Sequence, residues 1–292
     1  MEKERFLEDR VHGDTMFPLK MYKVDYLDGD VIINYHWHRE MEFIFLKEGS
    51  ISFQIGTSLI ELKEGEAIFI PSGQLHAAYP FKQCPFLLYA IVFDSTLLSS
   101  FTYDVIQSKY IELLKKTDSA LPFHIQMNTD WEKSMLQSLS IIIREYQHQE
   151  YGFELAIKAH LFLSISNLIK SNTVNTRNTM NQLIDTTKVN RLKLVLQYID
   201  NHYSEKLNIR ALSSVVQMSE GHFSRFFRSL VHMTPIEYIN TVRINKATKL
   251  LRESDEKIIN IAMEVGFDSP SYFIKTFKRQ KKCTPTRFRK LI

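Results

Sequence analysis

Residues 258–289 read IINIAMEVGFDSPSYFIKTFKRQKKCTPTRFR, and they repeat the pattern of a stretch 50 residues earlier. Residues 222–228 align with residues 272–278, and both copies follow the order aromatic, Phe, any residue, basic, any residue, Phe, basic. Further pairs stand at the same offset: Thr234-Pro235 with Thr284-Pro285, Ser219 with Ser269, and Ile209 with Ile259. Self-similarity at a fixed offset predicts two copies of one supersecondary unit.

Turn and capping residues divide each copy into a helix, a tight turn and a second helix. The first helices are expected over 208–216 and 258–265. The residues that mark the turns are Ser219 and Ser269 as N-caps, Gly266 as a helix terminator and Pro270 at a first helical position. Between the copies, the capping box Thr234-Pro235-Ile236-Glu237 predicts a long helix over 235–253, with Ile236, Ile244, Ala247 and Leu251 at helical spacing.

The second helix of each copy separates aromatic from polar residues. Phe223, Phe226 and Phe227 share one face in the first copy, and Phe273 and Phe277 do so in the second. A helix of this kind fits the major groove of DNA, where outward basic residues reach guanine edges and phosphates. The candidate DNA-binding residues are Glu220, Gly221, Ser224, Arg225, Arg228, Ser271, Lys275, Lys278 and Arg279.

Two of these residues occupy equivalent positions in the repeat. Arg225 suits a bidentate contact with guanine, whereas Lys275 offers a point charge. Arg228 and Lys278 lie one turn later, where phosphates are nearer. The alternative is a helical bundle with a solvated basic face.

The charge of the chain is distributed unevenly. Residues 189–292 contain 19 Lys and Arg against 9 Asp and Glu, whereas residues 1–188 contain 18 against 24. A basic module joined to an acidic one favours a polyanionic partner for the basic part. Together with the repeat, this makes DNA binding the better interpretation.

Residues from about 191 to 290 closely resemble the DNA-binding domain of AraC/XylS-type bacterial transcription regulators. The matching segments are residues 209–229, 234–251 and 258–289, and the most specific pattern is A-x-x-V-G-F-x-S-x-S-Y-F followed by T-P-x-x-F-R. The resemblance implies seven helices and two recognition helices in successive major-groove segments on one face of the DNA. Gly221 stands where a base-contacting side chain is common, and Lys275 stands where arginine is common.

Residues 19–93 alternate short apolar stretches with turn signals. Examples are VIINYHW at 31–37, MEFIFLK at 41–47 and FLLYAIVF at 86–93. Many short strands at this spacing predict an antiparallel barrel or sandwich. The polar residues 171–188 have no sustained period and indicate a linker.

Residues 130–148 and 153–170 repeat apolar residues at helical spacing and predict an antiparallel helix pair. Leu136, Leu139, Ile143 and Tyr146 form one stripe, and Leu155, Ala159, Phe162 and Leu163 lie near one face of the second helix. This apolar surface serves either a dimer contact or packing against the barrel.

Four residues in the strand region have the chemistry of a binding site. Strand alternation puts His36, His38 and Glu42 on one face if the strand is unbroken, and another strand could bring His76 opposite. Three imidazoles and a carboxylate could hold a divalent transition metal. Satisfied structural histidines are the simplest alternative.

The spacing around these residues resembles the two motifs of the cupin barrel over about residues 19–93, although Pro80 replaces the usual asparagine. In AraC-type regulators such a barrel implies a small-molecule sensor without a metal. We therefore expect His36, His38, Glu42 and His76 to bind an effector, with no metal and no cofactor. Sugars are common effectors of the family, but no residue identifies one.

Composition excludes several classes of protein. The 292 residues are 44% hydrophobic and 24% charged, as in soluble globular chains of two domains. The charged start MEKERFLEDR and the lack of an apolar run of about 20 residues exclude a signal peptide and a membrane span. Cys84 and Cys283 form neither a disulfide framework nor a zinc-finger spacing, so a cytoplasmic location is expected.

The sequence thus predicts an α+β multidomain protein. A cupin-like antiparallel β-barrel over 1–125 and a helix pair over 126–170 precede a linker over 171–190 and an all-α domain with two helix-turn-helix units over 191–292. The predicted function is transcription regulation without enzymatic activity, by a homodimer that binds operator or promoter DNA and a small-molecule effector, with RNA polymerase as a further candidate partner. A metal-dependent cupin enzyme with a basic helical appendage is the alternative.

Overall fold

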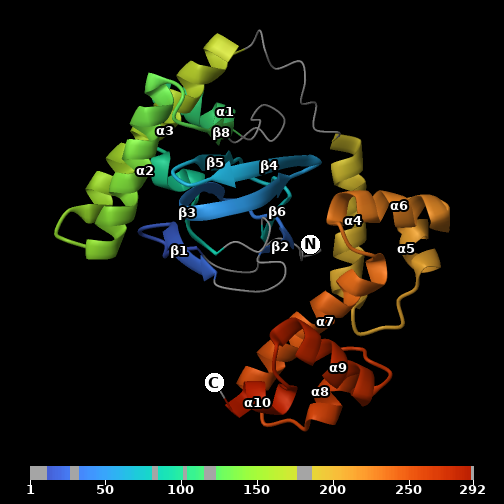
Figure 1. Ribbon diagram of the computed structural model, residues 1–292. Coiled ribbons are helices and arrows are strands. Elements are labelled where there is room, and N and C mark those ends of the chain that lie inside the picture. The colour runs from blue at the N-terminus through green and yellow to red at the C-terminus, as the bar shows by residue number, and fades with distance from the viewer. Residues whose placement is uncertain are drawn as a thin grey trace. The chain divides into compact units, whose positions relative to one another are not determined.

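The computed structural model describes residues 12–26, 33–80, 85–100, 104–114, 123–175 and 186–290 (Figure 1). The described residues up to Thr186 form one compact unit, and those from Thr187 form another. Within the described ranges, no helix is both long enough and apolar enough to cross a membrane.

The N-terminal unit is built on antiparallel strands. Its strands are β1 (Leu19–Tyr26), β2 (Ile33–His36), β3 (Met41–Ile55), β4 (Ser58–Lys63), β5 (Ala67–Ile70), β6 (His76–Pro80), β7 (Phe86–Phe93) and β8 (Phe123–Ile125). The first half of β3 pairs with β5 and β7, and its second half pairs with β4 and β6. β1 pairs with β7, β2 with β6, and β8 with β5. The predicted antiparallel β fold is confirmed.

A β-bulge divides the two halves of β3. The register against β7 shifts between Leu46 and Glu48. Ile44 before the shift and Ile51 after it belong to the same buried cluster, although their positions differ in parity. One extra residue reverses the alternation of a strand, so the bulge keeps apolar residues of both halves on the inner face.

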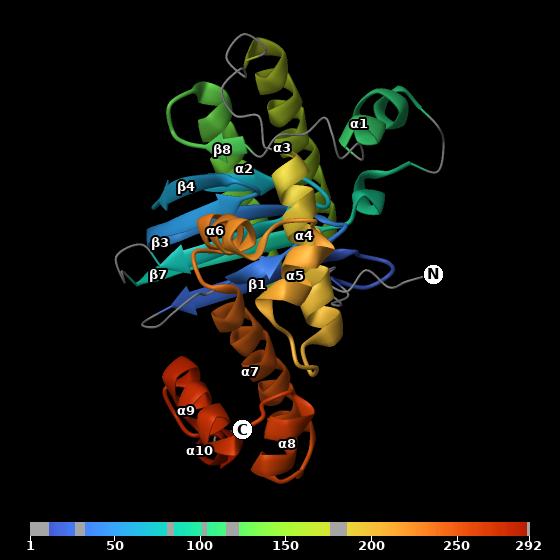
Figure 2. The same ribbon diagram turned by 90° about the vertical axis from the view of Figure 1, so that its right-hand side faces the viewer.

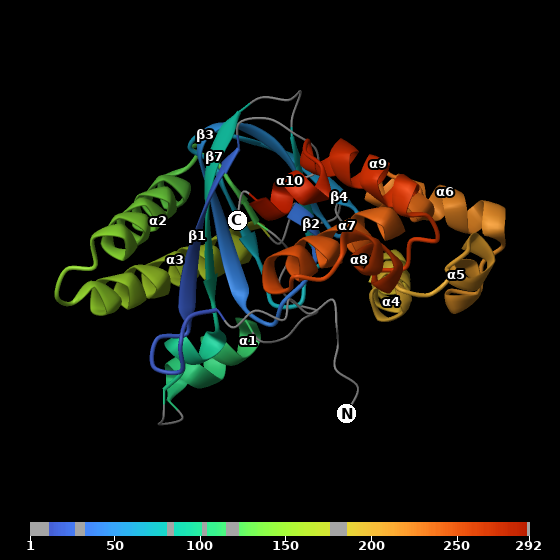
Figure 3. The same ribbon diagram turned by 90° about the horizontal axis from the view of Figure 1, so that it is seen from below.

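Two helices cover the other face of the sheet. They are α2 (Asp130–His148) and α3 (Phe153–Asn175), which pack against each other beside β1, β7 and β3 (Figure 3). Thr129 and Glu132 form a capping box at the start of α2. The short elements before them are η1 (Ser95–Leu98), η2 (Gln107–Ile111) and α1 (Glu112–Leu114).

The buried side of α3 differs from the face named from the sequence. Leu155 and Leu163 are 75% and 54% exposed, and Ala159 is exposed as well. The buried stripe of α3 consists of Ile157, Leu161, Ile165 and Leu168. Because apolar residues occur all around this helix, their spacing alone could not select the side that meets the sheet.

Both ends of the expected linker are helical. α3 continues to Asn175, where the buried Ser171 hydroxyl donates to the carbonyl of Leu168. α4 begins at Thr186. The middle of the expected linker, residues 176–185, lies outside the described residues.

The C-terminal unit contains seven helices within residues 186–290, as the family resemblance implies. They are α4 (Thr186–His202), α5 (Ile209–Val215), α6 (Glu220–Val231), α7 (Pro235–Glu253), α8 (Ile258–Glu264), α9 (Pro270–Lys281) and α10 (Pro285–Lys290). Figure 2 shows α7 running from the α4–α6 group to the α8–α10 group. The capping box of Thr234 and Glu237 begins α7 as predicted, but Ile236 is exposed.

Candidate nucleic-acid interface and buried histidine cluster

The second helices of the two helix-turn-helix units, α6 and α9, bury their aromatic faces. Phe223, Phe227, Phe273 and Phe277 are fully buried, and Phe226 is nearly so. Of the candidate DNA-binding residues, Ser224 is partly exposed, and the others are exposed: Glu220, Gly221, Arg225, Arg228, Ser271, Lys275, Lys278 and Arg279. The fold therefore leaves all nine side chains or positions accessible to a partner.

Both recognition-helix candidates lie on the same side of α7. In Figures 2 and 3, α6 and α9 stand on one side, and α5 and α8 stand on the other. Glu237, at the start of α7, interacts electrostatically with a basic residue of each of these two helices. Hydrogen bonds from Thr234 hold the pKa of Glu237 below its usual value, and the positive charges of Arg279 and Arg228 lower it further. One face of the unit thus carries basic residues from both repeats.

Polar contacts fasten α9 to α7 along its length. Asn240 donates from Nδ2 to the Tyr272 hydroxyl at 3.0 Å. Farther along, Gln280 donates to the Thr241 hydroxyl at 3.2 Å, and Lys281 donates to the Asn245 side-chain oxygen at 3.0 Å. α6 meets α7 through aromatic packing, since the Phe227 and Tyr238 rings lie edge to face with centroids 5.7 Å apart.

The turns of the two helix-turn-helix units differ by one residue. α5 and α8 correspond at an offset of 49 residues, whereas α6 and α9 correspond at 50. The backbone N–H of Met218 donates to Ser213, and that of Phe267 donates to Ala262, so these two residues are equivalent. The alignment of Ile209 with Ile259 is therefore wrong: Ile258 is the counterpart that packs against the core, and Ile259 is exposed.

The left-handed position in each turn also differs. Gln217 has a φ of 54° in the first unit, and Gly266 has a φ of 92° in the second. A Cβ atom on Gly266 would lie 2.7 Å from the carbonyl oxygens of Tyr203 and Ser204. Only glycine fits so close to another backbone segment, so Gly266 allows the second turn to pack on the chain that follows α4.

Arg243 of α7 holds the same segment from another side. Its Nε donates to the Tyr203 carbonyl at 2.7 Å, and a terminal nitrogen donates to the Glu205 carbonyl at 2.8 Å. The guanidinium also lies 5.6 Å from the centre of the Phe267 ring. Burial lowers the pKa of Arg243, although Asp268 and Tyr272 act in the opposite direction. Arg243 therefore links the segment after α4, α7 and the second turn.

In the N-terminal unit, the four predicted effector-binding residues lie together even though their strand is broken. β2 ends at His36, and β3 begins at Met41, so His38 lies in the connection. His36 pairs with His76 across β2 and β6, and their ring centroids are 4.1 Å apart. The prediction assumed one unbroken strand through these residues, and that assumption is wrong. The residues still come together, because β2 pairs with β6.

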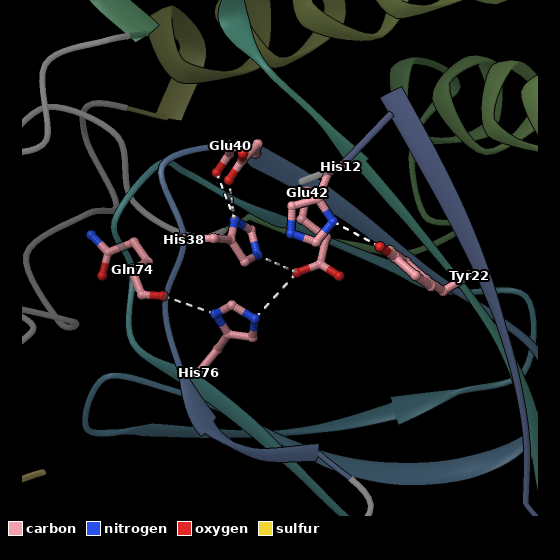
Figure 4. A network of polar contacts seen from close by, with 7 residues as sticks. All are labelled: His12, Tyr22, His38, Glu40, Glu42, Gln74 and His76. Atoms are coloured by element: carbon pink, nitrogen blue, oxygen red, sulfur yellow. Dashed lines mark hydrogen bonds and ion pairs between the residues drawn. The ribbon is translucent and has the colours of Figure 1, made fainter. Parts of the chain in front are cut away.

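A buried carboxylate joins two of the histidines (Figure 4). Glu42 Oε2 lies 3.2 Å from Nε2 of both His38 and His76. Burial alone would raise the pKa of Glu42, but the contacts with these histidines outweigh it and hold the pKa below its usual range. Burial lowers the pKa of His38, yet its contacts with Glu42 raise it overall. The network therefore favours a charged His38–Glu42 pair.

A family model described as a helix-turn-helix domain matches residues 212–291, and one described as a cupin domain matches residues 22–80. The chain is 28% identical over 283 residues to an uncharacterised HTH-type transcriptional regulator, YdeC, of Bacillus subtilis, covering 96% of this chain and 94% of the relative. In both of its domains the chain is thus similar to AraC-type transcription regulators.

Two further similarities are shorter. The chain is 37% identical over 98 residues to the bifunctional transcriptional activator/DNA repair enzyme AdaA of Bacillus subtilis, covering 34% of this chain and 46% of that protein. It is 31% identical to the DNA-binding domain of AdpA, solved in complex with a target DNA, covering 33% of this chain and 87% of that chain with a TM-score of 0.32.

The region matched by the cupin model has a donor set that fits a metal ion. Among the described residues, His36, His38 and His76 each offer a ring nitrogen, and these atoms lie within 4.8 Å of one another. The Nδ1 atoms of His38 and His76 lie 3.0 Å and 2.8 Å from the carbonyl oxygens of Glu40 and Gln74. Such contacts orient histidines for metal binding, and they equally order a pocket for a polar ligand.

Sequence reasoning missed two contributors to these sites. His12 is buried, its Nδ1 lies 2.9 Å from the Tyr22 hydroxyl, and its ring centroid lies 5.7 Å from that of His38. No local pattern marks His12, because it precedes the first strand. Arg243 did have a signal, since it lies three residues after Asn240 and four before Ala247, on the inward face of the predicted helix.

Proposed function

We propose that this protein is an AraC-type regulator that binds operator or promoter DNA through α6 and α9, and that a small polar effector bound at the histidine cluster controls this binding. The common placement of α6 and α9 on one side of α7, with the basic residues outward, carries the DNA part of the proposal. DNA binding implies a cytoplasmic location. The protein then acts as a regulator and not as an enzyme.

The salt dependence of binding tests the DNA interface. Arg228 is exposed near the end of α6, where phosphate contacts are expected. Replacing Arg228 by Ala should weaken binding to all duplexes alike and lower the slope of log affinity against log salt by about one. Fluorescence anisotropy of the full chain on labelled duplexes measures this slope. An unchanged slope would contradict the placement of Arg228 at the DNA, and Lys23→Ala in β1 serves as the control.

The effector part of the proposal rests on the buried polar groups. His38, Glu42 and His76 are 2%, 5% and 1% exposed, Glu42 contacts both histidines, and the Phe53 ring stacks on His76. Such groups could orient a small polar ligand by hydrogen bonds. Replacing His38 or His76 by Ala should alter the response to effector more than the affinity for DNA.

A panel of small polar compounds, sugars included, would be tested by thermal unfolding of the full chain. A compound at 100 times its Kd raises the free energy of unfolding by about 2.7 kcal/mol. This increase should disappear in His76→Ala and persist in the control His124→Ala, which removes a histidine paired with Glu66 outside the cluster. If His76→Ala abolishes DNA binding while the protein stays folded, the sensor assignment is wrong.

We also propose that the exposed apolar face of α3 forms a homodimer contact. Leu155 and Leu163 lie two turns apart on this face, with Ala159 between them and Phe162 beside them. A second copy of the same face would remove these leucines from water. Leu155→Glu with Leu163→Glu should therefore shift the full chain to monomer in sedimentation equilibrium. Leu59→Glu, at a similarly exposed leucine of β4, should not.

A metal-dependent cupin enzyme is the second candidate, favoured by the three converging histidines. The two candidates make opposite predictions for purified protein. Stoichiometric transition metal together with turnover of a substrate supports the enzyme. Operator binding by metal-free protein supports the ligand-responsive regulator. Elemental analysis and a binding assay on the same preparation separate them.

A further inference from the structure

At one outward position the two recognition helices differ in that only α9 carries an aliphatic side chain. Ser224 in α6 and Ile274 in α9 are equivalent in the repeat, and each follows an inward Phe. The Ser224 hydroxyl donates to the carbonyl of Glu220 at 2.8 Å, within its own helix. Ile274 instead presents an aliphatic side chain that is 40% exposed. The second helix therefore places an apolar group where the first has an internally bonded hydroxyl.

The core of the second unit does not account for Ile274. The buried cluster of this unit is formed by other residues of α7, α8, α9 and the turn, with Phe273 and Phe277 as the contributions of α9. Ile274 lies three residues after Ser271 and four before Lys278, and both of these are exposed. Residues at this spacing are neighbours on a helix surface. The isoleucine thus belongs to the outward, basic face of α9.

The neighbouring aromatic residue has a different role. Tyr272 is also exposed, but its hydroxyl accepts a hydrogen bond from Asn240, which directs it toward α7. Lys275 and Lys278 are long cations that can reach phosphates or acceptor atoms of bases. Ile274 has no polar atom in its side chain, so it can contribute to recognition only through an apolar contact.

We propose that Ile274 is a specificity-determining residue that contacts the C5-methyl group of a thymine in the major groove. This inference rests on the proposed function of α9 as a recognition helix. The thymine methyl is the one apolar group that the major-groove edges of the four bases present, and side chains recognise it by apolar contact. The first unit reads guanine through Arg225, and the second reads a T·A pair through Ile274, so the two half-sites differ in sequence.

Removal of a single methyl group from DNA tests this proposal directly. The full-length protein would first select duplexes from a pool with a random internal segment. Each thymine of the selected site would then be replaced, one at a time, by deoxyuridine, which lacks the C5-methyl but pairs in the same way. At one thymine of the half-site bound by α9, the affinity of the wild type should fall about fourfold, the effect of losing one buried methyl group.

The substitution Ile274→Ser, which introduces the residue type found at position 224, should abolish this deoxyuridine effect. Ile274→Val keeps a branched aliphatic side chain and should retain it. Ile259→Ser, at a 59% exposed isoleucine of α8, is the matched control and should behave as the wild type. Circular dichroism of each variant reports whether the fold is intact.

The outcomes separate this inference from the proposed function. If a sequence is selected but no thymine shows a deoxyuridine effect, or if the effect persists in Ile274→Ser, the role of Ile274 is overturned and DNA recognition stands. If no sequence is enriched at all, the proposed function fails, and the inference fails with it.

Discussion

The two helix-turn-helix units share their aromatic core but differ in their turns and outward residues. The Phe223–Phe227 and Phe273–Phe277 ring pairs each have centroids 5.7 Å apart. Outside this core, the second turn has one more residue and a glycine where the first has Gln217. The same buried aromatic core can therefore support two recognition helices with different base preferences, because the base contacts depend on exposed residues outside the core.

The largest effect is expected when the DNA half-sites of the two units are moved apart. If the single helix α7 fixes their spacing, the two binding segments should lie about one DNA turn, roughly 34 Å, apart. Inserting five base pairs between the half-sites turns one to the far side of the duplex. Affinity should then fall to that of a single unit, about 10²–10⁴-fold weaker.

Footprinting of the full chain on the two duplexes checks this expectation. The same five base pairs inserted outside the footprint provide the control and should change nothing. Equal protection of both half-sites after the internal insertion would show that the units are not rigidly spaced.

The turns can be compared through their stability. Replacing Gly266 by Ala puts a Cβ atom 2.7 Å from the carbonyl oxygens of Tyr203 and Ser204, at a φ of 92°. Strained backbone and overpacking together should lower the free energy of unfolding by about 2–4 kcal/mol. Gln217→Ala in the first unit is the matched variant, and it should cost less than about 1 kcal/mol since alanine replaces another non-glycine residue. Urea unfolding measures both, and equal losses would remove the distinction between the turns.

The two readers can be compared through Arg225. Arg225→Ala should weaken specific binding by about 1–3 kcal/mol and relax the preference at one base pair of the first half-site. Lys275→Ala should weaken binding with less change in base preference, because an ammonium group is a point charge. Selection of bound sequences by each variant reports both effects. Should Arg225→Ala leave affinity and preference unchanged, α6 would not be the reader of the first half-site.

The smallest expected difference concerns the helix caps. The Ser269 hydroxyl accepts a hydrogen bond from the backbone N–H of Tyr272 at the start of α9. The Ser219 side chain makes no equivalent capping bond at the start of α6, among the described residues 186–290. Ser269→Ala should therefore lower the free energy of unfolding by about 0.5–1 kcal/mol, with almost no change for Ser219→Ala. Thermal unfolding of the two variants side by side decides between them. A larger loss for Ser219→Ala would contradict the assignment of the caps.

Local signals allowed the sequence to predict much of the fold. The bounds of α2 and α7 match the ranges 130–148, predicted from apolar spacing, and 235–253, predicted from a capping box, and the structure has a capping box at the start of each helix. Apolar periodicity predicts the extent of both helices, and proline at the first position further marks the start of α7. The antiparallel strands followed in the same way from short apolar stretches between turn residues.

Features that depend on tertiary contacts were harder to predict. The extra residue in the second turn shifted the pairing of Ile209 from Ile259 to Ile258, since only the backbone hydrogen bonds reveal where the insertion lies. The buried side of α3 depends on the sheet that it meets. The meeting of His36 and His76 followed from their motifs, but the contribution of His12 depends on the path of the chain before β1.

The contacts of Gly266 and Arg243 with the chain after α4 have a consequence for chain truncation and for synthesis. Tyr203 and Ser204 precede the first helix-turn-helix unit, but one of the groups that secures them, Gly266, comes about sixty residues later. A chain that ends after α7 contains every residue of the first unit and still lacks this support. We therefore expect the segment after α4 to reach its final packing only after nearly the whole module has left the ribosome. A variant that binds DNA through the first unit alone is accordingly better made by substituting exposed residues of α9 than by truncating the chain.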